Sequence, residues 1–579
     1  MAIAATTIWE IKAGSTANNV NGGGFNTANA NMLADLTTDA DTANTDDPIV
    51  SSASYNFVAG DVGNWVYIQA GTNWTVGFYK ISAVAANKAT LMAAVGEAVQ
   101  LNTTYNRYRA NTVAGCATVG TPTSGTFAID YSQSTAAIIH STDGTSTAST
   151  TFSSVTGGFT PVMVGNILHM LSATGADEIV GWYEVVDYTD ANTLVLDRVS
   201  GTYTLADFYI GGAMSLNSTL DDDFHEAGIA GNIYFYTGSL TLAEAVSTAL
   251  AATAVAPIEH IGYNAIRGDN PTPFGTSPTA PLINCGSASS FATGAYHTIS
   301  YMRFTGSNTT VLGGGANGVN KYFKSTNTSA TAARDAFNPG ADGSSWNFET
   351  VCQNGEAIAM NGTNHRIIDF YSHDSRMGLL YNSSRQTAIR GLLTNNIGGI
   401  SNTNGPTATC DHCTVHGFTT PTATSIGVNM EAGDNCHFNN SIFDGYVTLI
   451  NQQTTQDKIA RGQYNAFYNY TTLASLYNID ITDIVGTDPA YTDAGELSGT
   501  GATSSGAVIT LTGADLSAIE DNVDYIWVVS ATTATAMAYL ITSHDDGADT
   551  VTVSPSPGTG SNIVWRIGTG HDYSLTSSL

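Results

Sequence analysis

Positive charge is scarce in this sequence. Lys and Arg together number 18 of 579 residues against 48 Asp and Glu, so the formal net charge is 18 − 48 = −30. A chain this acidic, with no basic cluster, does not attract the phosphates of a nucleic acid. Nucleic acid is therefore excluded as an expected partner.

Long apolar runs and a secretory signal are also lacking. No segment approaches the roughly 20 consecutive apolar residues that span a bilayer. The first 14 residues, MAIAATTIWEIKAG, contain neither the basic region nor the apolar core of a signal peptide. We therefore expect synthesis in the cytoplasm without export and without membrane insertion.

Cysteine and charge of either sign are sparse as well. Six Cys in so long a chain do not form a disulfide framework. Only 11% of residues are charged, but 42% are hydrophobic and spread throughout, which is not typical of disorder. The abundance of Gly, Asn, Thr and Ser suits β structure with many tight turns. These features predict an all-β protein.

A short pattern recurs over residues 301–470, in which an apolar pair or triplet ends on a small or polar turn residue. Eight copies align when these turn positions are taken as equivalent: Thr305, Asn327, Asn354, Asp374, Asn395, His416, Asp444 and Tyr468. Their steps of 22, 27, 20, 21, 21, 28 and 24 residues each match one coil of a solenoid. The pattern predicts a right-handed parallel β-helix over residues 221–490, with at least eight coils. Its register places Val415, Phe443 and Phe467 in one internal stack.

A larger repeat flanks this solenoid. FVAGDVGNWVYI at 57–68 and GFYKISAV at 77–84 return as FTPVMVGNILHM at 159–170 and GWYEVVDY at 181–188, with a looser copy at 525–554. The repeat predicts one small antiparallel β unit present three times. The expected domains are an extended N-terminal segment at 1–24, β modules at 25–115 and 116–220, the β-helix at 221–490 and a third β module at 491–579.

Several motifs resemble a known protein family. They are EIKAGSTANNVNGGGF at 10–25, DYSQSTA at 130–136, IGGAMSL at 210–216 and API-x-x-IGYN-x-x-RGD at 256–269, together with the two VGN modules. In these the chain resembles phage virion structural proteins of the pectate-lyase-like, tailspike-like right-handed parallel β-helix family. The resemblance implies a fibre, spike or surface decoration of a virion, often trimeric, and some such proteins cleave host polysaccharide. We interpret Arg267-Gly268-Asp269 as a turn of this motif and not as an adhesion tripeptide.

Polysaccharide cleavage on a β-helix needs carboxylates on neighbouring coils. The predicted register puts Asp369, Arg390, Asp411 and Asn439 in one column. Asp369 and Asp411 would lie roughly 10 Å apart at a strand spacing of about 4.8 Å, near the range of about 6.5–9.5 Å in inverting glycoside hydrolases. If the protein is an enzyme, Asp369, Arg390 and Asp411 are the candidate catalytic residues. The alternative is a solvated ladder in which Arg390 bridges two acids.

Aromatic and acidic residues provide further candidate sites. Trp65, Trp74 and Trp182 could stack on a glycan, although their alternation along strands favours the core. Asp39, Asp41 and Asp46 have calcium-like spacing. That segment lacks the Gly and the distal Glu of an EF-hand loop, so a solvated acidic loop is the favoured alternative.

Cys410 and Cys413 stand at a spacing that superficially suggests zinc. On a strand, an odd separation directs their side chains to opposite faces, which does not form a tetrahedral site. We expect Cys413 over Ser441 and Cys410 beside Phe438, as small core residues. Neither a metal nor a cofactor is predicted.

Two functions follow from these observations. The first is a non-catalytic phage virion structural protein on the particle surface, as tail fibre, spike or capsid decoration. It would serve host-surface or glycan attachment as a homotrimer, with other virion proteins as partners. The alternative is a tailspike polysaccharide depolymerase, a glycoside hydrolase or lyase acting on host-surface glycan.

Overall fold

The computed structural model describes residues 7–15, 20–38, 48–92, 100–102, 107–109, 121–175, 177–215, 231–242, 246–247, 252–287, 290–307, 309–331, 334–403, 407–417, 425–430, 435–452, 460–463, 465–468, 472–474, 484–485, 497–517, 519, 525–534, 538–554 and 556–568. The chain divides into two compact units, one of residues 1–271 and 279–304 and the other of residues 272–278 and 305–579. Within the described ranges, no helix is long and apolar enough to cross a membrane.

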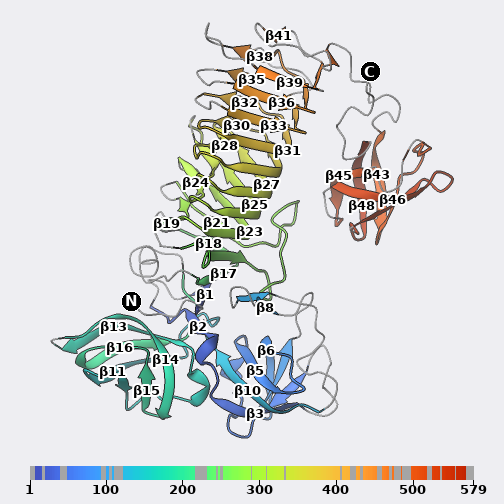
Figure 1. Ribbon diagram of the computed structural model, residues 1–579. Coiled ribbons are helices and arrows are strands. Elements are labelled where there is room, and N and C mark those ends of the chain that lie inside the picture. The colour runs from blue at the N-terminus through green and yellow to red at the C-terminus, as the bar shows by residue number, and fades with distance from the viewer. Residues whose placement is uncertain are drawn as a thin grey trace. The chain divides into compact units, whose positions relative to one another are not determined.

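The main element is a parallel β-solenoid of about nine turns, as Figure 1 shows. In the first unit its larger sheet contains β17 (Ile233–Thr237), β18 (Ser239–Thr241), β20 (Ile258–Gly262), β21 (Leu282–Asn284) and β23 (His297–Gly306). In the second unit the larger sheet begins with β25 (Val319–Asn327), β27 (Ser344–Cys352), β29 (Arg366–His373) and β31 (Gln386–Thr394). It continues with β33 (Thr407–Asp411), β34 (Thr414–His416), β36 (Asn435–Asn439), β37 (Ile442–Asp444), β39 (Ala460–Gln463), β40 (Ala466–Tyr468) and β42 (Ile484–Val485).

A smaller parallel sheet forms a second side of the coils. In the second unit its strands are β24 (Thr310–Gly313), β26 (Asp335–Asn338), β28 (Glu356–Met360), β30 (Met377–Tyr381), β32 (Gly398–Asn402), β35 (Ile426–Met430), β38 (Thr448–Gln452) and β41 (Thr472–Ala474). The first unit contributes β19 (Val246–Ser247) and β22 (Phe291–Ala292). The predicted all-β solenoid is thus confirmed.

Apolar side chains stack from coil to coil inside the solenoid. The pairing of Val415 with Phe443, and of Phe443 with Phe467, confirms the predicted stack. In the smaller sheet a longer series is paired in register and buried: Phe337, Ile358, Leu379, Ile400, Val428 and Ile450. Each such side chain contributes about 1.5–3 kcal/mol relative to its exposure. This repeated burial is what fixes the register of short strands.

The predicted turn register is correct in part. His416 pairs with Asp444, and Asp444 pairs with Tyr468, as expected. Two steps are wrong. Asn327 pairs with Cys352 and not with Asn354. His416 pairs with Thr394 and not with Asn395, because that coil is one residue longer than the sequence steps suggest.

Three closed six-stranded antiparallel barrels accompany the solenoid. Barrel 1 contains β3 (Leu33–Thr38), β4 (Ile49–Ser51), β5 (Trp65–Thr72), β6 (Gly77–Ala85), β7 (Lys88–Met92) and β10 (Thr123–Asp130). Barrel 2 contains β11 (Ile139–Thr147), β12 (Thr151–Ser153), β13 (Ile167–Gly175), β14 (Gly181–Asp190), β15 (Thr193–Leu196) and β16 (Thr202–Ile210). Barrel 3 contains β43 (Leu497–Ser505), β44 (Val508–Thr510), β45 (Tyr525–Thr532), β46 (Ala538–Asp545), β47 (Thr550–Ser554) and β48 (Gly560–Gly568).

The three barrels have the same strand order. In each, the first strand neighbours the second, the second the fifth, the fifth the fourth, the fourth the third and the third the sixth, which closes on the first. The predicted internal repeat is therefore confirmed. The third copy is a complete barrel, although its sequence matches the other two only loosely.

A Val-Gly-Asn turn positions the third strand in barrels 1 and 2. Gly63 and Gly165 have φ of 94° and 93°, in the left-handed region that favours glycine. The Gly63 N–H donates to Ile81 O at 2.9 Å, and the Gly165 N–H donates to Val185 O at 2.8 Å. The turn therefore ties the third strand to the fourth in the same way twice.

We predict that alanine at these two glycines has unequal effects. Gly63→Ala places a side chain at positive φ in open space and should cost about 1–2 kcal/mol. Gly165→Ala should cost more, because its Cβ would also lie 2.6 Å from the Asn26 carbonyl oxygen. Thermal unfolding followed by circular dichroism measures the difference. Gly60→Ala is the control, since its Cβ would meet nothing within 4 Å. Equal melting temperatures for all three variants would contradict the prediction.

Candidate functional site

Two carboxylates meet on the smaller sheet within the second unit. Asp335 begins β26, Glu356 begins β28, and the parallel register pairs them directly. Paired residues on adjacent strands are about 4.8 Å apart, and here the two carboxyl groups are hydrogen bonded to each other. The pair is therefore a candidate acid–base site.

The surroundings of the pair separate the roles of its members. Burial first, and then the negative charge of Glu356, raise the pKa of Asp335 to about 7. Thr310 and Asn338 donate hydrogen bonds to Asp335 Oδ2 at 3.3 and 3.4 Å. Glu356 instead forms an ion pair with Arg376. A carboxylic acid that keeps a proton near neutral pH, beside a carboxylate, is an arrangement suited to general acid–base chemistry.

Sequence reasoning missed this pair for a definite reason. The predicted step from Asn327 to Asn354 is two residues longer than the true step from Asn327 to Cys352. In that register Asp335 and Glu356 fall out of step, although their separation of 356 − 335 = 21 residues is one coil length. An acid repeated at one coil length was the signal that could have found them.

A second polar cluster lies on the larger sheet. Glu349 on β27 forms ion pairs with Lys324 at 2.5 Å and with His373 Nε2 at 3.0 Å. His373 Nδ1 lies 2.7 Å from Asp374. Burial alone would raise the pKa of Glu349, but the His373 hydrogen bond and Lys324 lower it overall. Burial likewise lowers the pKa of His373, but Glu349 and Asp374 raise it overall. The cluster is an ionic network with its charges matched.

The predicted catalytic residues are only partly brought together. Arg390 donates from Nε and Nη2 to Asp369 at 2.6 and 2.8 Å, and the two side chains are 56% and 38% exposed. Asp411 pairs in register with Ile389 and not with Arg390. Its carboxylate instead lies 3.1 Å from His412 Nδ1. Asp369 and Arg390 thus form an exposed ion pair, and Asp411 stands in the neighbouring column.

The three tryptophans considered for glycan binding are buried. Trp65, Trp74 and Trp182 are 0%, 6% and 3% exposed. The Trp182 ring stacks on His169 at 4.1 Å between ring centres. These positions match the core alternative. The calcium candidates Asp39, Asp41 and Asp46 lie outside the described residues.

The cysteines occupy the solenoid interior. Cys410 pairs in register with Phe438, and the Cys413 N–H donates to Ser441 Oγ at 3.1 Å, which confirms both expected neighbours. Burial raises the pKa of the Cys410 and Cys436 thiols far above the usual range. Across the part of the chain that is described, no three His, Cys, Asp or Glu side chains are grouped so as to hold a metal ion.

The family-like motifs converge on one buried ionic junction in the first unit. Arg267 donates to Glu10 Oε2 from Nε at 3.0 Å and from Nη2 at 2.7 Å, and to Asp130 Oδ2 from Nη1 at 2.7 Å. Its Nη2 also donates to Ser132 Oγ at 3.0 Å, and Tyr263 OH donates to the second oxygen of Glu10. Glu10 and Asp130 are 0% exposed and Arg267 is 3% exposed. These residues come from three of the motifs far apart in the sequence.

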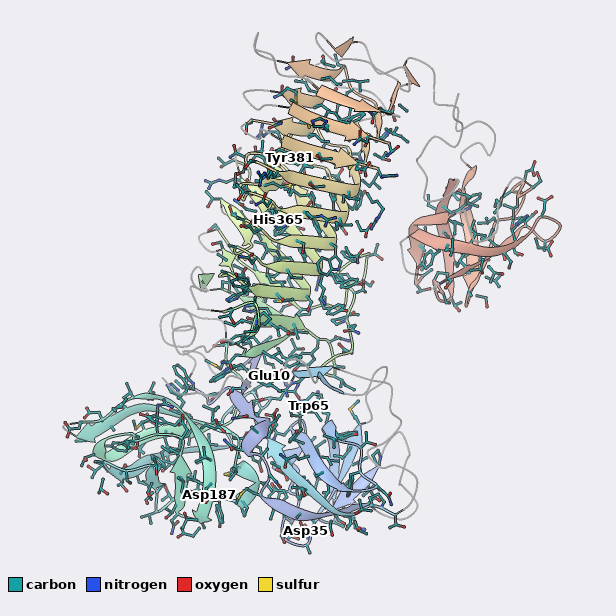
Figure 2. The ribbon with its side chains drawn as sticks, in the orientation of Figure 1. Glu10, Asp35, Trp65, Asp187, His365 and Tyr381 are labelled. Carbon is teal, nitrogen blue, oxygen red and sulfur yellow. The ribbon has the colours of Figure 1, made fainter. Side chains whose placement is uncertain are left out.

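Aromatic rings surround the guanidinium of this junction. Arg267 lies 5.2 Å from the ring centre of Trp65, 5.5 Å from that of Phe78 and 5.2 Å from that of Phe235; Figure 2 labels Trp65 and Glu10. Asp269 accepts hydrogen bonds from the N–H groups of the turn at residues 264–266. With its Arg buried and its Asp capping a turn, the Arg-Gly-Asp segment is structural, as the sequence interpretation has it.

Comparisons with known proteins give fold-level likenesses. Neither protein families nor curated proteins yield a match. Among solved structures, a Paenibacillus alginate lyase is 10% identical at a TM-score of 0.26, covering 47% of this chain and 99% of the lyase. The tailspike protein of Pseudomonas phage LKA1 is 10% identical at 0.22, with 76% and 82% covered. The tailspike protein of E. coli bacteriophage HK620, in complex with a pentasaccharide, is 9% identical at 0.26, with 59% and 81% covered.

The solved structures that this chain resembles are thus polysaccharide lyases and phage tailspikes. At such low identity and TM-score the likeness adds nothing to what the strand pairing of the chain itself establishes.

We predict that removing the junction cation destabilises the protein far more than removing an exposed one. Arg267→Met leaves Glu10 and Asp130 buried and unpaired, which should cost about 3–5 kcal/mol. Arg390→Met is the control, because its exposed pair with Asp369 should contribute at most about 1 kcal/mol. Urea unfolding of both variants measures the two costs. Similar losses would show that the junction does not stabilise the first unit.

We predict that Asp335 makes stability fall as pH rises from about 4 to about 7. Its pKa is about 7 in the folded chain against a usual 3.8, so the folded state binds more protons in this window. The contribution is at most about 4 kcal/mol and smaller because the side chain is partly exposed. Asp335→Asn should flatten the pH dependence of the melting temperature. Asp187→Asn, on an exposed residue of β14, should leave it unchanged. An unaltered slope in Asp335→Asn would refute the raised pKa.

Proposed function

We propose that this chain is a phage virion structural protein displayed on the particle surface, as a tail fibre, spike or capsid decoration. In this proposal it attaches to host-surface glycan and assembles as a homotrimer with other virion proteins as its neighbours. The observation that carries the proposal is the convergence of the family-like motifs on the Arg267 junction. The resemblance therefore concerns how the chain is built, which is the property that virion structural proteins of this kind have in common.

The state of the larger sheet supports attachment over catalysis. Its acids are engaged with bases, as in the pairs Asp369–Arg390, Asp444–His416 and Glu349–Lys324. A matched ionic ladder is soluble and rigid, but its carboxylates are already neutralised by partners. The formal charge of −30 suits a surface that stays soluble before assembly and does not adhere to packaged nucleic acid.

The test is the location of the protein. Mass spectrometry and immunogold microscopy of gradient-purified particles of the encoding phage should find this chain on their surface. Sedimentation equilibrium of the purified protein should give three times the chain mass of 60.3 kDa. A chain found in infected-cell lysate but absent from purified particles would refute the virion role, and a stable monomer would refute the trimer.

The Asp335–Glu356 pair favours a second candidate function, a polysaccharide depolymerase. A proton donor with a pKa of about 7 beside a carboxylate could protonate a glycosidic oxygen. Under this alternative, Asp335→Asn and Glu356→Gln should each lower the release of reducing ends from host glycan by at least about 100-fold. Asp187→Asn should keep full activity. Release that is unchanged in both pair variants would eliminate the pair as its source.

A further inference from the structure

The three barrels can be compared residue by residue because their first and sixth strands carry a bulge at the same place. The pairs on the two sides of the bulge correspond. They are Leu33–Phe127 and Leu36–Gly125 in barrel 1, Ser141–Phe208 and Gly144–Ala206 in barrel 2, and Gly499–Trp565 and Ala502–Ile563 in barrel 3. Within the bulge, Asp35, Asp143 and Gly501 therefore occupy equivalent positions.

In barrels 1 and 2 this aspartate closes a seam. Asp35 accepts hydrogen bonds from Ser52 Oγ at 2.6 Å and from the Ser54 N–H at 2.7 Å. In barrel 2 the equivalent Asp143 accepts from Ser154 Oγ and from the Thr156 N–H, the latter at 2.9 Å. In both barrels the serine directly follows the second strand. The aspartate therefore fastens the loop after the second strand to the first strand.

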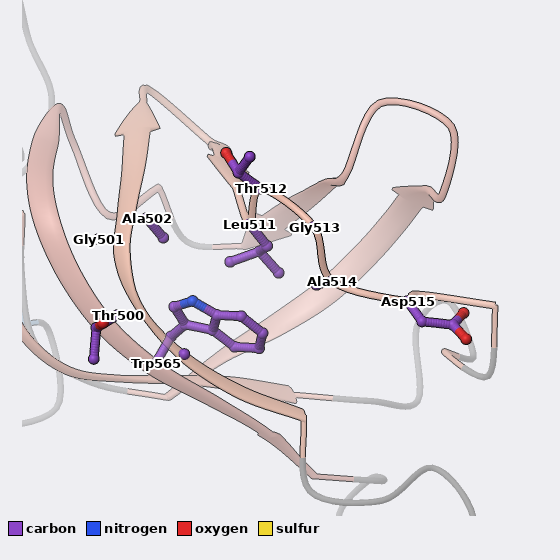
Figure 3. A pocket seen from close by; sticks show the side chains of 10 residues that line it. Thr500, Gly501, Ala502, Leu511, Thr512, Gly513, Ala514, Asp515 and Trp565 are labelled. Atoms are coloured by element: carbon purple, nitrogen blue, oxygen red, sulfur yellow. The ribbon is translucent and has the colours of Figure 1, made fainter.

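Barrel 3 has lost this fastening. Gly501 replaces the aspartate, and Leu511 stands directly after the second strand, where the other barrels have serine. A cavity of about 260 Å³ opens between the two segments, lined by Thr500, Thr512, Ala514, Asp515 and Trp565 among others. Figure 3 shows the Trp565 indole in the middle of these residues. The aromatic position that is Phe127 or Phe208 elsewhere is the large indole of Trp565 here.

The lining of this cavity selects a class of ligand. An indole offers an apolar face to the C–H groups of a sugar ring, while threonine hydroxyls and a carboxylate can bond its hydroxyl groups. The neighbouring groups are acidic: Asp549 accepts from the Gly513 N–H at 2.6 Å, and Asp546 accepts from the Leu516 N–H at 2.8 Å. An acidic rim disfavours uronic and other anionic sugars.

We propose that this cavity of barrel 3 binds one neutral sugar ring, with Trp565 as the stacking surface and Asp515 as a hydrogen-bond acceptor for sugar hydroxyls. The site deepens the glycan-attachment part of the proposed function and rests on that function for the source of the sugar. Barrels 1 and 2, with their aspartates in place, have no equivalent role.

Ligand-detected NMR on the full chain tests the site with methyl glucoside, methyl galactoside, methyl mannoside and methyl rhamnoside, and with glucuronate as the anionic probe. At least one neutral glycoside should bind saturably in the millimolar range, and glucuronate at least 10-fold more weakly. Rebuilding the fastening with Gly501→Asp and Leu511→Ser should reduce binding at least 10-fold. Trp565→Phe, which places in barrel 3 the residue that barrels 1 and 2 already hold, should weaken binding several-fold.

The matched control is Ser52→Ala, which removes the same fastening in barrel 1 and should leave sugar binding unchanged. Absence of saturable binding for every neutral glycoside would overturn the proposal, as would equal binding by the wild-type chain and both barrel 3 variants. Failure here is separable from failure of the proposed function. A chain found on particles that binds no sugar removes the site alone, whereas a sugar-binding chain absent from particles removes the virion role alone.

Discussion

The first unit depends on the burial of one cation between two anions. A buried guanidinium is costly unless its donors are satisfied and its charge is balanced. Arg267 meets both conditions through Glu10, Asp130 and Ser132. Burial alone would lower its pKa, but the two carboxylates hold that pKa above its already high usual value, so the residue stays charged. The partners come from β1 (Thr7–Lys12), from the end of β10 and from the turn after β20. The three segments can settle only together, because none can bury its charge without the others.

The solenoid follows a different physical logic. Its coils repeat a few apolar contacts, so that the energy of each coil is provided by its neighbours and no single residue is decisive. Polar side chains on the larger sheet are accommodated by pairing across coils, as Glu349 is with Lys324 and His373. The barrels add closed sheets without free edges, a form that resists unwanted pairing with other chains. The protein thus combines one highly specific junction with many interchangeable contacts.

Much of this arrangement could be predicted from the sequence, because its signals are periodic. Coil-length spacing of apolar residues predicts the solenoid, and the VGN repeat predicts the shared barrel topology. The acid pair could not be predicted, because one coil is shorter than its turn residues suggest, and an error of two residues hides Asp335 from Glu356. Asp369 and Arg390 were difficult for another reason. Both have φ near 50°, so the strand alternation that a sequence register assumes is interrupted at that column. The Arg267 junction was marked by its motifs, but which side chains meet there requires three-dimensional contacts.

The pairing of β1 bears on the order in which the chain is made. β1 lies parallel to β17, antiparallel to β2 (Gly24–Asn26), and bridges Met214 through Ile11. It therefore covers the open edge of the first coil, the place where another copy could otherwise add as an extra strand. Because residues 7–12 leave the ribosome more than 200 residues before Ile233, the cover is synthesised before the edge that it protects. Each coil that follows then forms on an edge already closed at its start, so growth of the solenoid proceeds in one direction, away from the N-terminus, and end-to-end polymerisation of nascent chains is blocked from that side.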